Sequence, residues 1–267
     1  MLLSVVRKIL TSIITRRATD QVDDYVAESQ AGFRPGRSTA DGIFFTRSMC
    51  ERALLGNWHY SAALLDFGGA FDTVIRSKAL ERMDAAGMST ATAATLVSNT
   101  SARVKLNGHL SVPFDTNIGV VQGDPMSPLM FITYAEGTMK EIRAVIPPNS
   151  SLPTQFTQYA DDTTIHNTNV NDTKNIVNSS QSKFAGDNLM LNMDKTKFIT
   201  VSKAENEWKS VKLLGSLLGT TEDISNRISA ANRAFSSIEW KHHCLPSRLA
   251  MFQSLVLLVH LDIDKDS

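Results

Sequence analysis

Two patterns of apolar and polar positions alternate along this chain, one typical of strands and one typical of helices. The run YSAALL at 60–65 is continuously apolar or small, which is typical of a buried strand. Residues 76–87 and 125–145 have the spacing of amphipathic helices. A third helix is expected over about 173–187, with Asp172 as a candidate cap. Helices thus alternate with short strands.

Turn residues predict two hairpins. Asn107-Gly108 lies between RVKL and SVPF, and this dipeptide is a strong hairpin signal. The tetrapeptide 159–162 (YADD) also has β-prone residues on both sides. The remaining expected elements are strands at 197–202 and 211–218 and helices near 223–240 and 247–260. Helices packed on hairpin-linked strands predict an α+β fold built on an antiparallel sheet.

Composition is that of a globular chain. The sequence has 267 residues, of which 42% are hydrophobic, and only two cysteines, which argues against a disulfide framework. No apolar run approaches the length of a membrane span. Lysine plus arginine equals aspartate plus glutamate, 27 against 27, although nucleic-acid-binding domains usually carry a basic surplus. The first 20 residues fit either a structural helix, which we favour, or a transit peptide.

Three acidic residues carry the strongest chemical signal. Asp161 and Asp162 are adjacent at the predicted hairpin tip, and Asp66 follows the predicted buried strand. Carboxylates brought together repel one another unless a divalent cation neutralises them. Mg²⁺ prefers such oxygen ligands, and two such ions assist phosphoryl transfer. Taken singly, each acid could instead cap or close a turn.

The order of the motifs resembles the reverse transcriptases. LLDFGGAFDTV, GVVQGDPMSPLMF and YADD follow the order and approximate spacing of motifs A, B and C of that family. ESQAGFRPGRST resembles the fingers segment of the LINE-type (non-LTR) retrotransposon and group II intron branch. NLMLNMDKTKFITV and VKLLGSLLG are similar to motifs D and E. The resemblance covers residues from about 1 to 260.

This resemblance implies a right-hand polymerase fold. Fingers are expected at about 1–59, an antiparallel palm at about 60–218, and an incomplete helical thumb at 219–267. Relatives have a basic strand before the first helix and a longer thumb, so we expect a core truncated at both ends. The implied activity is RNA-directed DNA polymerisation inside the cell, not in the secreted fraction. The implied partners are an RNA template, a DNA primer and deoxynucleoside triphosphates, with no membrane.

The resemblance also assigns the catalytic roles. Asp66, Asp161 and Asp162 are the implied ligands of two Mg²⁺ ions, with Mn²⁺ as a possible substitute. Lys195 matches the motif D lysine proposed to protonate the leaving pyrophosphate. Phe71 lies where the family sets a ring beneath C2′ of the nucleotide, which favours deoxynucleotides.

Four further residues are expected at the nucleotide. Arg34 matches a residue that reaches the triphosphate, with Arg37 a weaker candidate, and Phe67 matches one whose carbonyl adds a metal ligand. Gln122 and Gly123 match the element that contacts the nascent base pair and the template. Relatives commonly have a basic residue or proline before that glutamine, whereas this chain has a valine, which puts template contact in doubt.

Two alternatives remain open from the sequence. A catalytically inactive retroelement remnant, which at most binds nucleic acid, is favoured by the missing ends and the zero net charge. An RNA-dependent RNA polymerase is disfavoured, because Phe71 and the alanine of YADD both favour DNA synthesis. Asp72 is expected to stabilise its turn, and Lys197 to face solvent or nucleic acid.

Overall fold

A computed structural model describes residues 3–98, 100–146, 155–202 and 207–237. The chain divides into two compact units, Met1–Ala204 and Glu205–Ser267. All predicted site residues lie in the first unit. The expected helix at 247–260 lies outside the described residues. The boundaries expected for fingers, palm and thumb stay predictions.

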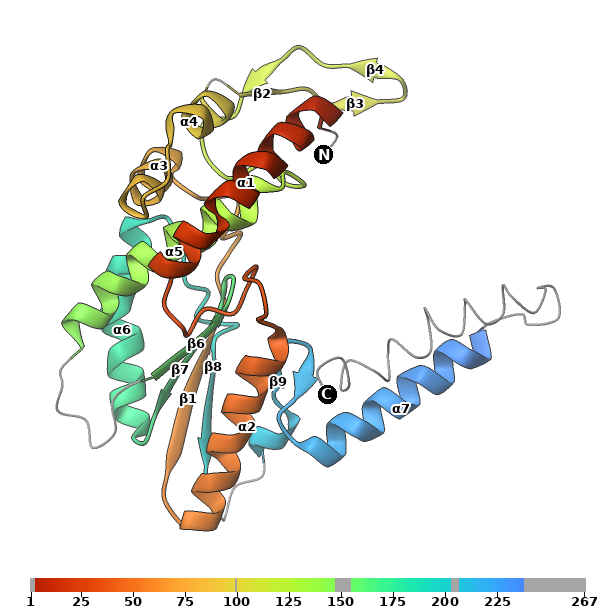
Figure 1. Ribbon diagram of the computed structural model, residues 1–267. Coiled ribbons are helices and arrows are strands. Elements are labelled where there is room, and N and C mark those ends of the chain that lie inside the picture. The colour runs from red at the N-terminus through yellow and green to blue at the C-terminus, as the bar shows by residue number, and fades with distance from the viewer. Residues whose placement is uncertain (1–2, 99, 147–154, 203–206, 238–267) are drawn as a thin grey trace. The chain divides into compact units, whose positions relative to one another are not determined.

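A four-stranded antiparallel sheet forms the centre of the first unit (Figure 1). Its strands, in spatial order, are β6 (Gln155–Tyr159), β7 (Asp162–Asn167), β1 (Tyr60–Leu65) and β8 (Lys197–Val201). Every residue of β1 is buried, because helices cover both faces of the sheet (Figure 1). These helices are α2 (Thr39–Gly56) and α6 (Val170–Gly186). The predicted buried strand, the YADD hairpin and the 197–202 strand are confirmed.

The other helices of this unit lie beyond one end of the sheet (Figure 1). They are α1 (Val5–Tyr25), α3 (Arg76–Ala85), α4 (Ala91–Val97) and α5 (Met126–Val145). The helices predicted at 76–87 and 125–145 are confirmed, as is a structural helix near the N-terminus. The predicted cap of α6 is wrong. The side chain of Asn169 accepts hydrogen bonds from the backbone N–H groups of Asn171 and Asp172, so the helix starts one turn early.

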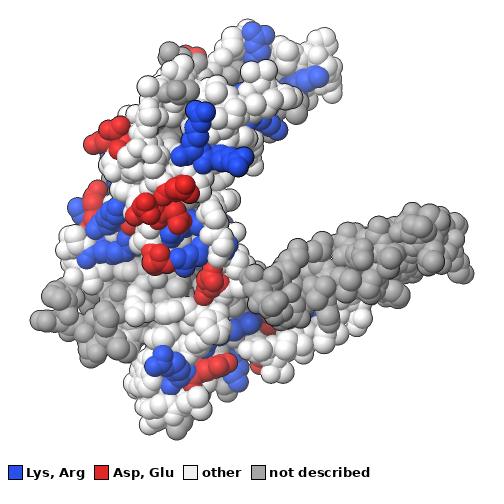
Figure 2. All heavy atoms as spheres, in the orientation of Figure 1, with Lys and Arg blue, Asp and Glu red and all other residues white. Residues whose placement is uncertain are grey.

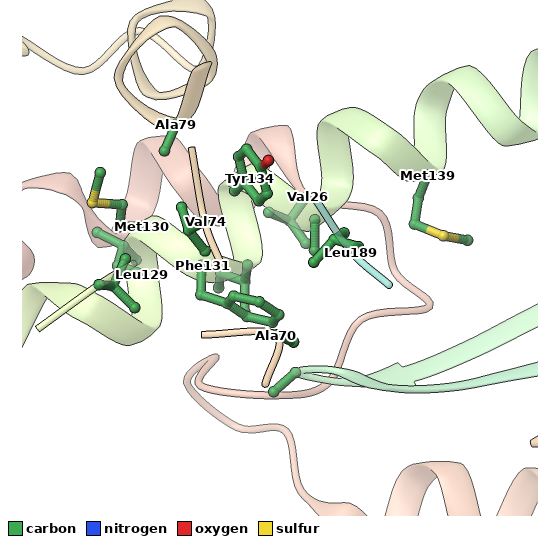
Figure 3. Close-up of a cluster of buried hydrophobic side chains, with 14 of the residues drawn as sticks. Val26, Ala70, Val74, Ala79, Leu129, Met130, Phe131, Tyr134, Met139 and Leu189 are labelled. Atoms are coloured by element: carbon green, nitrogen blue, oxygen red, sulfur yellow. The ribbon is translucent and has the colours of Figure 1, made fainter. Parts of the chain in front are cut away.

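The hydrophobic core joins these helices to the sheet. In Figure 3, Phe131 and Tyr134 of α5 point toward side chains from the segment after β1 and from α3. Phe131, Tyr134 and Met139 are at most 1% exposed. Full burial of such side chains stabilises the fold by about 1.5–3 kcal/mol each. The core therefore fixes α5 against the segment that follows β1.

Short strands complete both units. The predicted Asn107-Gly108 hairpin is confirmed by β3 (Lys105–Leu106) and β4 (His109–Leu110), and β2 (Ser101–Ala102) pairs with β5 (Phe114–Asp115). The second unit contains η1 (Glu207–Ser210), β9 (Lys212–Leu213), β10 (Ser216–Leu217) and α7 (Thr220–Ser237). The single strand predicted at 211–218 is wrong, because Leu214 and Gly215 adopt left-handed φ angles and form a hairpin turn.

Charged side chains are unevenly distributed over the first unit. On the face shown in Figure 2, acidic groups gather near the middle, whereas the end that carries β2–β4 shows mainly basic ones. Arg103 and Lys105 are exposed in that ribbon. Although the net charge of the chain is zero, one region of its surface is therefore basic. Within the described ranges, no helix combines the length and the apolar character needed to cross a membrane.

Candidate functional site

The tip of the β6–β7 hairpin holds two of the predicted acids. Tyr159 pairs with Asp162, so the connection contains only Ala160 and Asp161. Ala160 has a φ of 57°, the left-handed value that tight hairpin turns require. Asp161 is half-buried and Asp162 is exposed. The turn thus holds adjacent carboxylates at the end of the sheet.

Strand register brings the third acid to the same end. In the antiparallel β1–β7 pair, Leu65 lies opposite Thr163. The next position along β1 is Asp66, which the same register carries to the level of Asp162. Residues nearly one hundred positions apart in the sequence therefore meet at one edge.

The electrostatics of the hairpin acids are consistent with three carboxylates near one another. Burial raises the pKa of Asp161, and the negative charge of Asp66 raises it further, while a backbone hydrogen bond lowers it. Burial also raises the pKa of Asp162, followed by the charges of Asp161 and Asp66. Among the described residues, no ion pair reaches any of these carboxylates. The cluster is therefore an uncompensated negative site.

The residues fit a divalent cation in part. Carboxylate oxygens are the ligands that Mg²⁺ prefers, and a cation would relieve the repulsion that raises both pKa values. However, no group of three or more acidic, histidine or cysteine side chains in the described part of the chain is arranged to hold a metal. Mg²⁺ at phosphoryl-transfer sites usually takes one or two carboxylates plus substrate phosphates and water. Asp66, Asp161 and Asp162 suit that incomplete ligand set.

The loop that contains Gln30 and Gly32 supports the turn that carries Asp161 and Asp162. Gln30 is 1% exposed, and its side chain contacts both backbone groups of Ala160: Oε1 accepts from the N–H at 2.8 Å and Nε2 donates to the carbonyl at 3.1 Å. A Cβ on Gly32 would lie 2.3 Å from the nitrogen of Ala160, so only glycine permits this approach. Sequence reasoning missed Gln30. The motif QAGFRPGRS, which contains this residue, was the only signal that could have indicated it.

Backbone hydrogen bonds attach the motif D segment to Asp66. Asn192 N–H donates to the Asp66 carbonyl at 2.8 Å, and Gly68 N–H donates to the Met190 carbonyl at 3.0 Å. Lys195 is exposed in the following turn, where its N–H donates to the Asn192 carbonyl at 3.2 Å. Backbone hydrogen bonds therefore connect Asp66 to the segment that carries Lys195, the predicted general acid.

Phe71 lies in a cluster of aromatic rings. It stacks on Phe131 with ring centroids 4.0 Å apart, and it forms a T-shaped pair with Phe33 at 6.2 Å. Phe67 instead packs on Phe184, with centroids 4.9 Å apart, so its side chain joins the core. Asp72 directly follows Phe71 and is exposed, and its N–H donates to the Gly69 carbonyl, which closes the turn over residues 69–72.

The motif B loop is bonded to motif A. Val120 N–H donates to the Phe71 carbonyl, and Gly119 N–H donates to the Val74 carbonyl, both at 2.9 Å. Gln122 and Gly123 follow as exposed residues. The structure thus brings Gln122 and Gly123 to the same region as Phe71.

Asp124 anchors this loop and was missed by sequence reasoning. Its buried carboxylate accepts from the backbone N–H of Met126 at 3.1 Å, at the start of α5, and pairs with Arg7 of α1 at 2.8 Å. No local signal around Asp124 indicated a partner more than one hundred residues away.

Arg34 is bonded within the loop that carries it. Its side chain is buried, and its guanidinium donates to the Asp23 carboxylate at 2.5 Å and to the carbonyls of Asp23, Ala27 and Gln30. In this arrangement Arg34 holds the fingers loop. Triphosphate binding by Arg34 stays a prediction. Arg37 pairs with Glu28, and Lys197 is exposed on β8.

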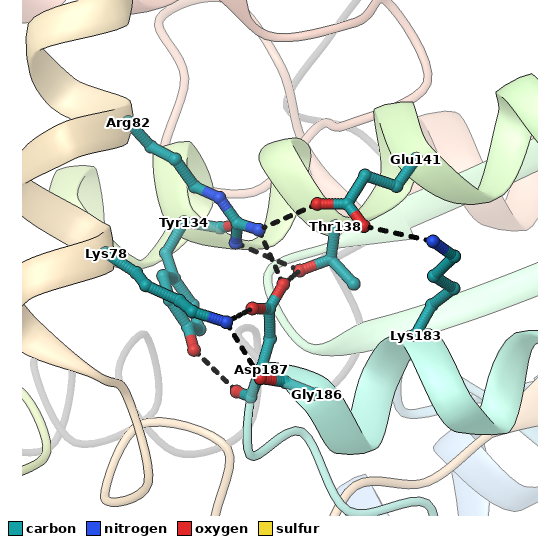
Figure 4. Close-up of polar contacts among 8 residues, drawn as sticks. All are labelled: Lys78, Arg82, Tyr134, Thr138, Glu141, Lys183, Gly186 and Asp187. Atoms are coloured by element: carbon teal, nitrogen blue, oxygen red, sulfur yellow. Dashed lines mark hydrogen bonds and ion pairs between the residues drawn. The ribbon is translucent and has the colours of Figure 1, made fainter.

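A second acidic centre is formed by Asp187, which directly precedes the motif D segment in the sequence (Figure 4). Asp187, directly after α6, pairs with Lys78 at 2.8 Å and Arg82 at 2.5 Å, and accepts from the hydroxyl of Thr138 at 2.6 Å. Tyr134 donates to its carbonyl at 2.5 Å. These hydrogen bonds and the Arg82 charge outweigh burial and lower the pKa of Asp187. The centre fixes the chain that continues to Asn192 and Lys195.

Comparisons with known proteins agree with this geometry. A family model described as reverse transcriptase (RNA-dependent DNA polymerase) matches residues 1–218. No curated protein matches the sequence.

Solved telomerase structures share the fold. The chain is similar to a Candida tropicalis telomerase in complex with a TWJ fragment of telomeric RNA (TM-score 0.65, 11% identity), covering 96% of this chain and 46% of that one. Apo telomerase from the same organism gives a TM-score of 0.64 at 14% identity, covering 92% and 45%. A form truncated from its C-terminal domain gives 0.54 at 13% identity, covering 76% and 43%. The chain spans less than half the length of these proteins. The α+β polymerase fold is confirmed.

Proposed function

Since the chain belongs to the reverse transcriptase family, we propose that it is the core of an RNA-directed DNA polymerase. The observation that supports this most is the uncompensated cluster of Asp66, Asp161 and Asp162 at one end of the palm sheet. Its proposed substrates are an RNA template, a DNA primer and deoxynucleoside triphosphates. An intracellular location stays a prediction.

The three carboxylates would hold two Mg²⁺ ions together with the phosphates of the nucleotide. Bound there, the ions supply charge neutralisation and orientation for in-line displacement. The primer 3′-oxygen forms a bond to the α-phosphorus as the bond to the β-phosphate oxygen breaks, and the hydroxyl proton leaves to solvent. Lys195 gives a proton to the departing pyrophosphate oxygen, a contribution of about 10²–10⁴-fold in such reactions.

Two residues of the chain, Phe71 and Gln122, would select and orient the nucleotide. The Phe71 ring, stacked on buried Phe131, would occupy the space that a ribose 2′-hydroxyl needs. Gln122, exposed in the loop bonded to motif A, would hydrogen-bond to the nascent pair. Phe71 together with Ala160 favours DNA synthesis over RNA synthesis. The motif ESQAGFRPGRST favours a LINE-type (non-LTR) origin, which is also part of this proposal.

Primer extension on an RNA template with Mg²⁺ tests the proposal. Wild type is compared with Asp161→Ala and with Asp84→Ala, which removes an exposed acid of α3. We expect deoxynucleotide incorporation by wild type and Asp84→Ala, none by Asp161→Ala, and poor use of ribonucleotides. A folded wild-type protein that incorporates nothing would support the alternative, an inactive remnant. A binding measurement with primer–template would then show whether that remnant still binds nucleic acid.

A further inference from the structure

Phe33 has two unfavourable features at once. It adopts a φ of 58°, the left-handed region that bulky residues rarely enter, and its side chain is 48% exposed. Neither feature stabilises the fold by itself. A strained, exposed aromatic residue beside a reactive site is a reason to look for a function.

The ring of Phe33 connects the fingers loop to both catalytic motifs. It forms a T-shaped, edge-to-face pair with Phe71 of motif A, with centroids 6.2 Å apart and planes at 85°. It also lies 6.3 Å from the ring of Tyr159, which precedes the turn of the YADD hairpin. Phe71 also stacks at 4.0 Å on Phe131, which is 1% exposed. Phe71 therefore contacts both a buried ring and the ring of Phe33.

Neighbouring residues fix Phe33 from both sides. Before it, Gln30 bonds to Gly32 and to the catalytic turn. After it, Arg34 donates to Asp23 and to nearby carbonyls. These contacts give Arg34 a structural task, because they hold the loop in the conformation that directs the Phe33 ring at Phe71.

We propose that Phe33 is a specificity-determining positioning residue that holds Phe71 in its sugar-excluding orientation. This inference rests on the proposed function. A ring contacted on one face only could turn about its side-chain torsions and make room for a 2′-hydroxyl. The edge contact from Phe33 removes that freedom, so discrimination between deoxyribose and ribose depends on both rings.

The test measures the ratio of kcat/KM for dGTP over GTP on one primer–template. Phe33→Ala should lower this ratio by about threefold to tenfold, the range expected for losing one aromatic pair, while dGTP use changes less. Phe33→Leu, which keeps bulk without a ring edge, should fall between Phe33→Ala and wild type. Unchanged melting temperatures would show that these variants fold.

A double-mutant cycle with Phe71→Ala makes the test specific. In the Phe71→Ala background, adding Phe33→Ala should leave the ratio unchanged, because no ring remains to be held. The inference is overturned if Phe33→Ala leaves the ratio intact in the presence of Phe71, or lowers it equally in both backgrounds. Absence of incorporation by wild type would instead refute the proposed function, and this inference with it.

Discussion

Two acidic centres of the first unit differ in how their charge is compensated. Asp187 is surrounded by Lys78, Arg82 and the Thr138 hydroxyl, and its pKa is lowered. Asp161 and Asp162 have mainly other acids as charged neighbours, and their pKa values are raised. Both centres lie at ends of core elements, so burial alone does not explain the difference.

The difference separates a compensated acid from uncompensated ones. Asp187 has charged and hydrogen-bonding partners within the protein, so it can stabilise the fold without any ligand. The repulsion among the hairpin acids would be relieved by positive charge from outside the protein, as the proposed function requires. Perturbed pKa values concentrate at functional sites for this reason, and the sign of the shift distinguishes the two roles here.

The largest expected effect is on catalysis. Asp66→Asn should reduce Mg²⁺-dependent incorporation by about 10³-fold or more, since several kcal/mol of transition-state stabilisation depend on the ions. Its stability in urea should not fall, because the substitution removes a repulsive charge. Steady-state primer extension and urea unfolding measure the two quantities. If Asp66→Asn unfolded instead of only losing activity, Asp66 would have a structural role like that of Asp187, and the two centres would not differ.

The reverse pattern is expected at the structural acid. Asp187→Ala should lower the free energy of unfolding by about 3 kcal/mol, because Arg82 loses its buried partner. Glu141→Gln is a matched control, since Glu141 is a half-exposed partner of the same arginine and should cost less than about 0.5 kcal/mol (Figure 4). Equal losses in both variants would contradict a special role for Asp187.

Added Mg²⁺ should stabilise only the hairpin centre. At a concentration ten times the dissociation constant, binding to the folded state raises stability by about 1.4 kcal/mol. We expect a higher melting temperature for wild type and for Glu141→Gln, and no shift for the double variant Asp66→Asn/Asp161→Asn. An equal shift in that double variant would place the binding elsewhere.

The smallest effect is on the pH dependence of stability. The lowered pKa of Asp187 contributes stability that is present above its ordinary value of 3.8 and is lost as pH falls through the folded-state pKa. The raised pKa values of Asp161 and Asp162 act oppositely, so stability falls as pH rises from 3.8 through those higher values. In metal-free buffer, Asp161→Asn/Asp162→Asn should remove this second fall in pH-resolved urea unfolding. Persistence of the fall would assign it to other groups.

Local patterns predicted much of the palm. The strand at 60–65, the YADD hairpin and the helix at 125–145 each carry their own signal, whether a period, a turn dipeptide or an apolar run. The grouping of Asp66 with Asp161 and Asp162 came from the family resemblance, and the β1–β7 register now accounts for it.

Long-range polar partners could not be predicted in this way. Nothing near Gln30 indicates that it contacts Ala160, nor does Asp124 indicate Arg7. Arg34 was expected at the triphosphate because its motif suggested it, whereas its donors contact Asp23 and nearby carbonyls. The 211–218 segment was interpreted as one strand because leucine is not a turn residue. Only the structure shows that Leu214 has a left-handed φ.

The support of the catalytic turn by Gln30 has a consequence for the order of synthesis. The two partners are 130 residues apart, and β1 acquires its last neighbour only when residues 197–201 join the sheet. A nascent chain therefore holds Gln30 without its partner until the hairpin has emerged from the ribosome. Contacts this distant in sequence also slow folding. Gln30 and Ala160 must therefore meet before the hairpin acids have fixed positions.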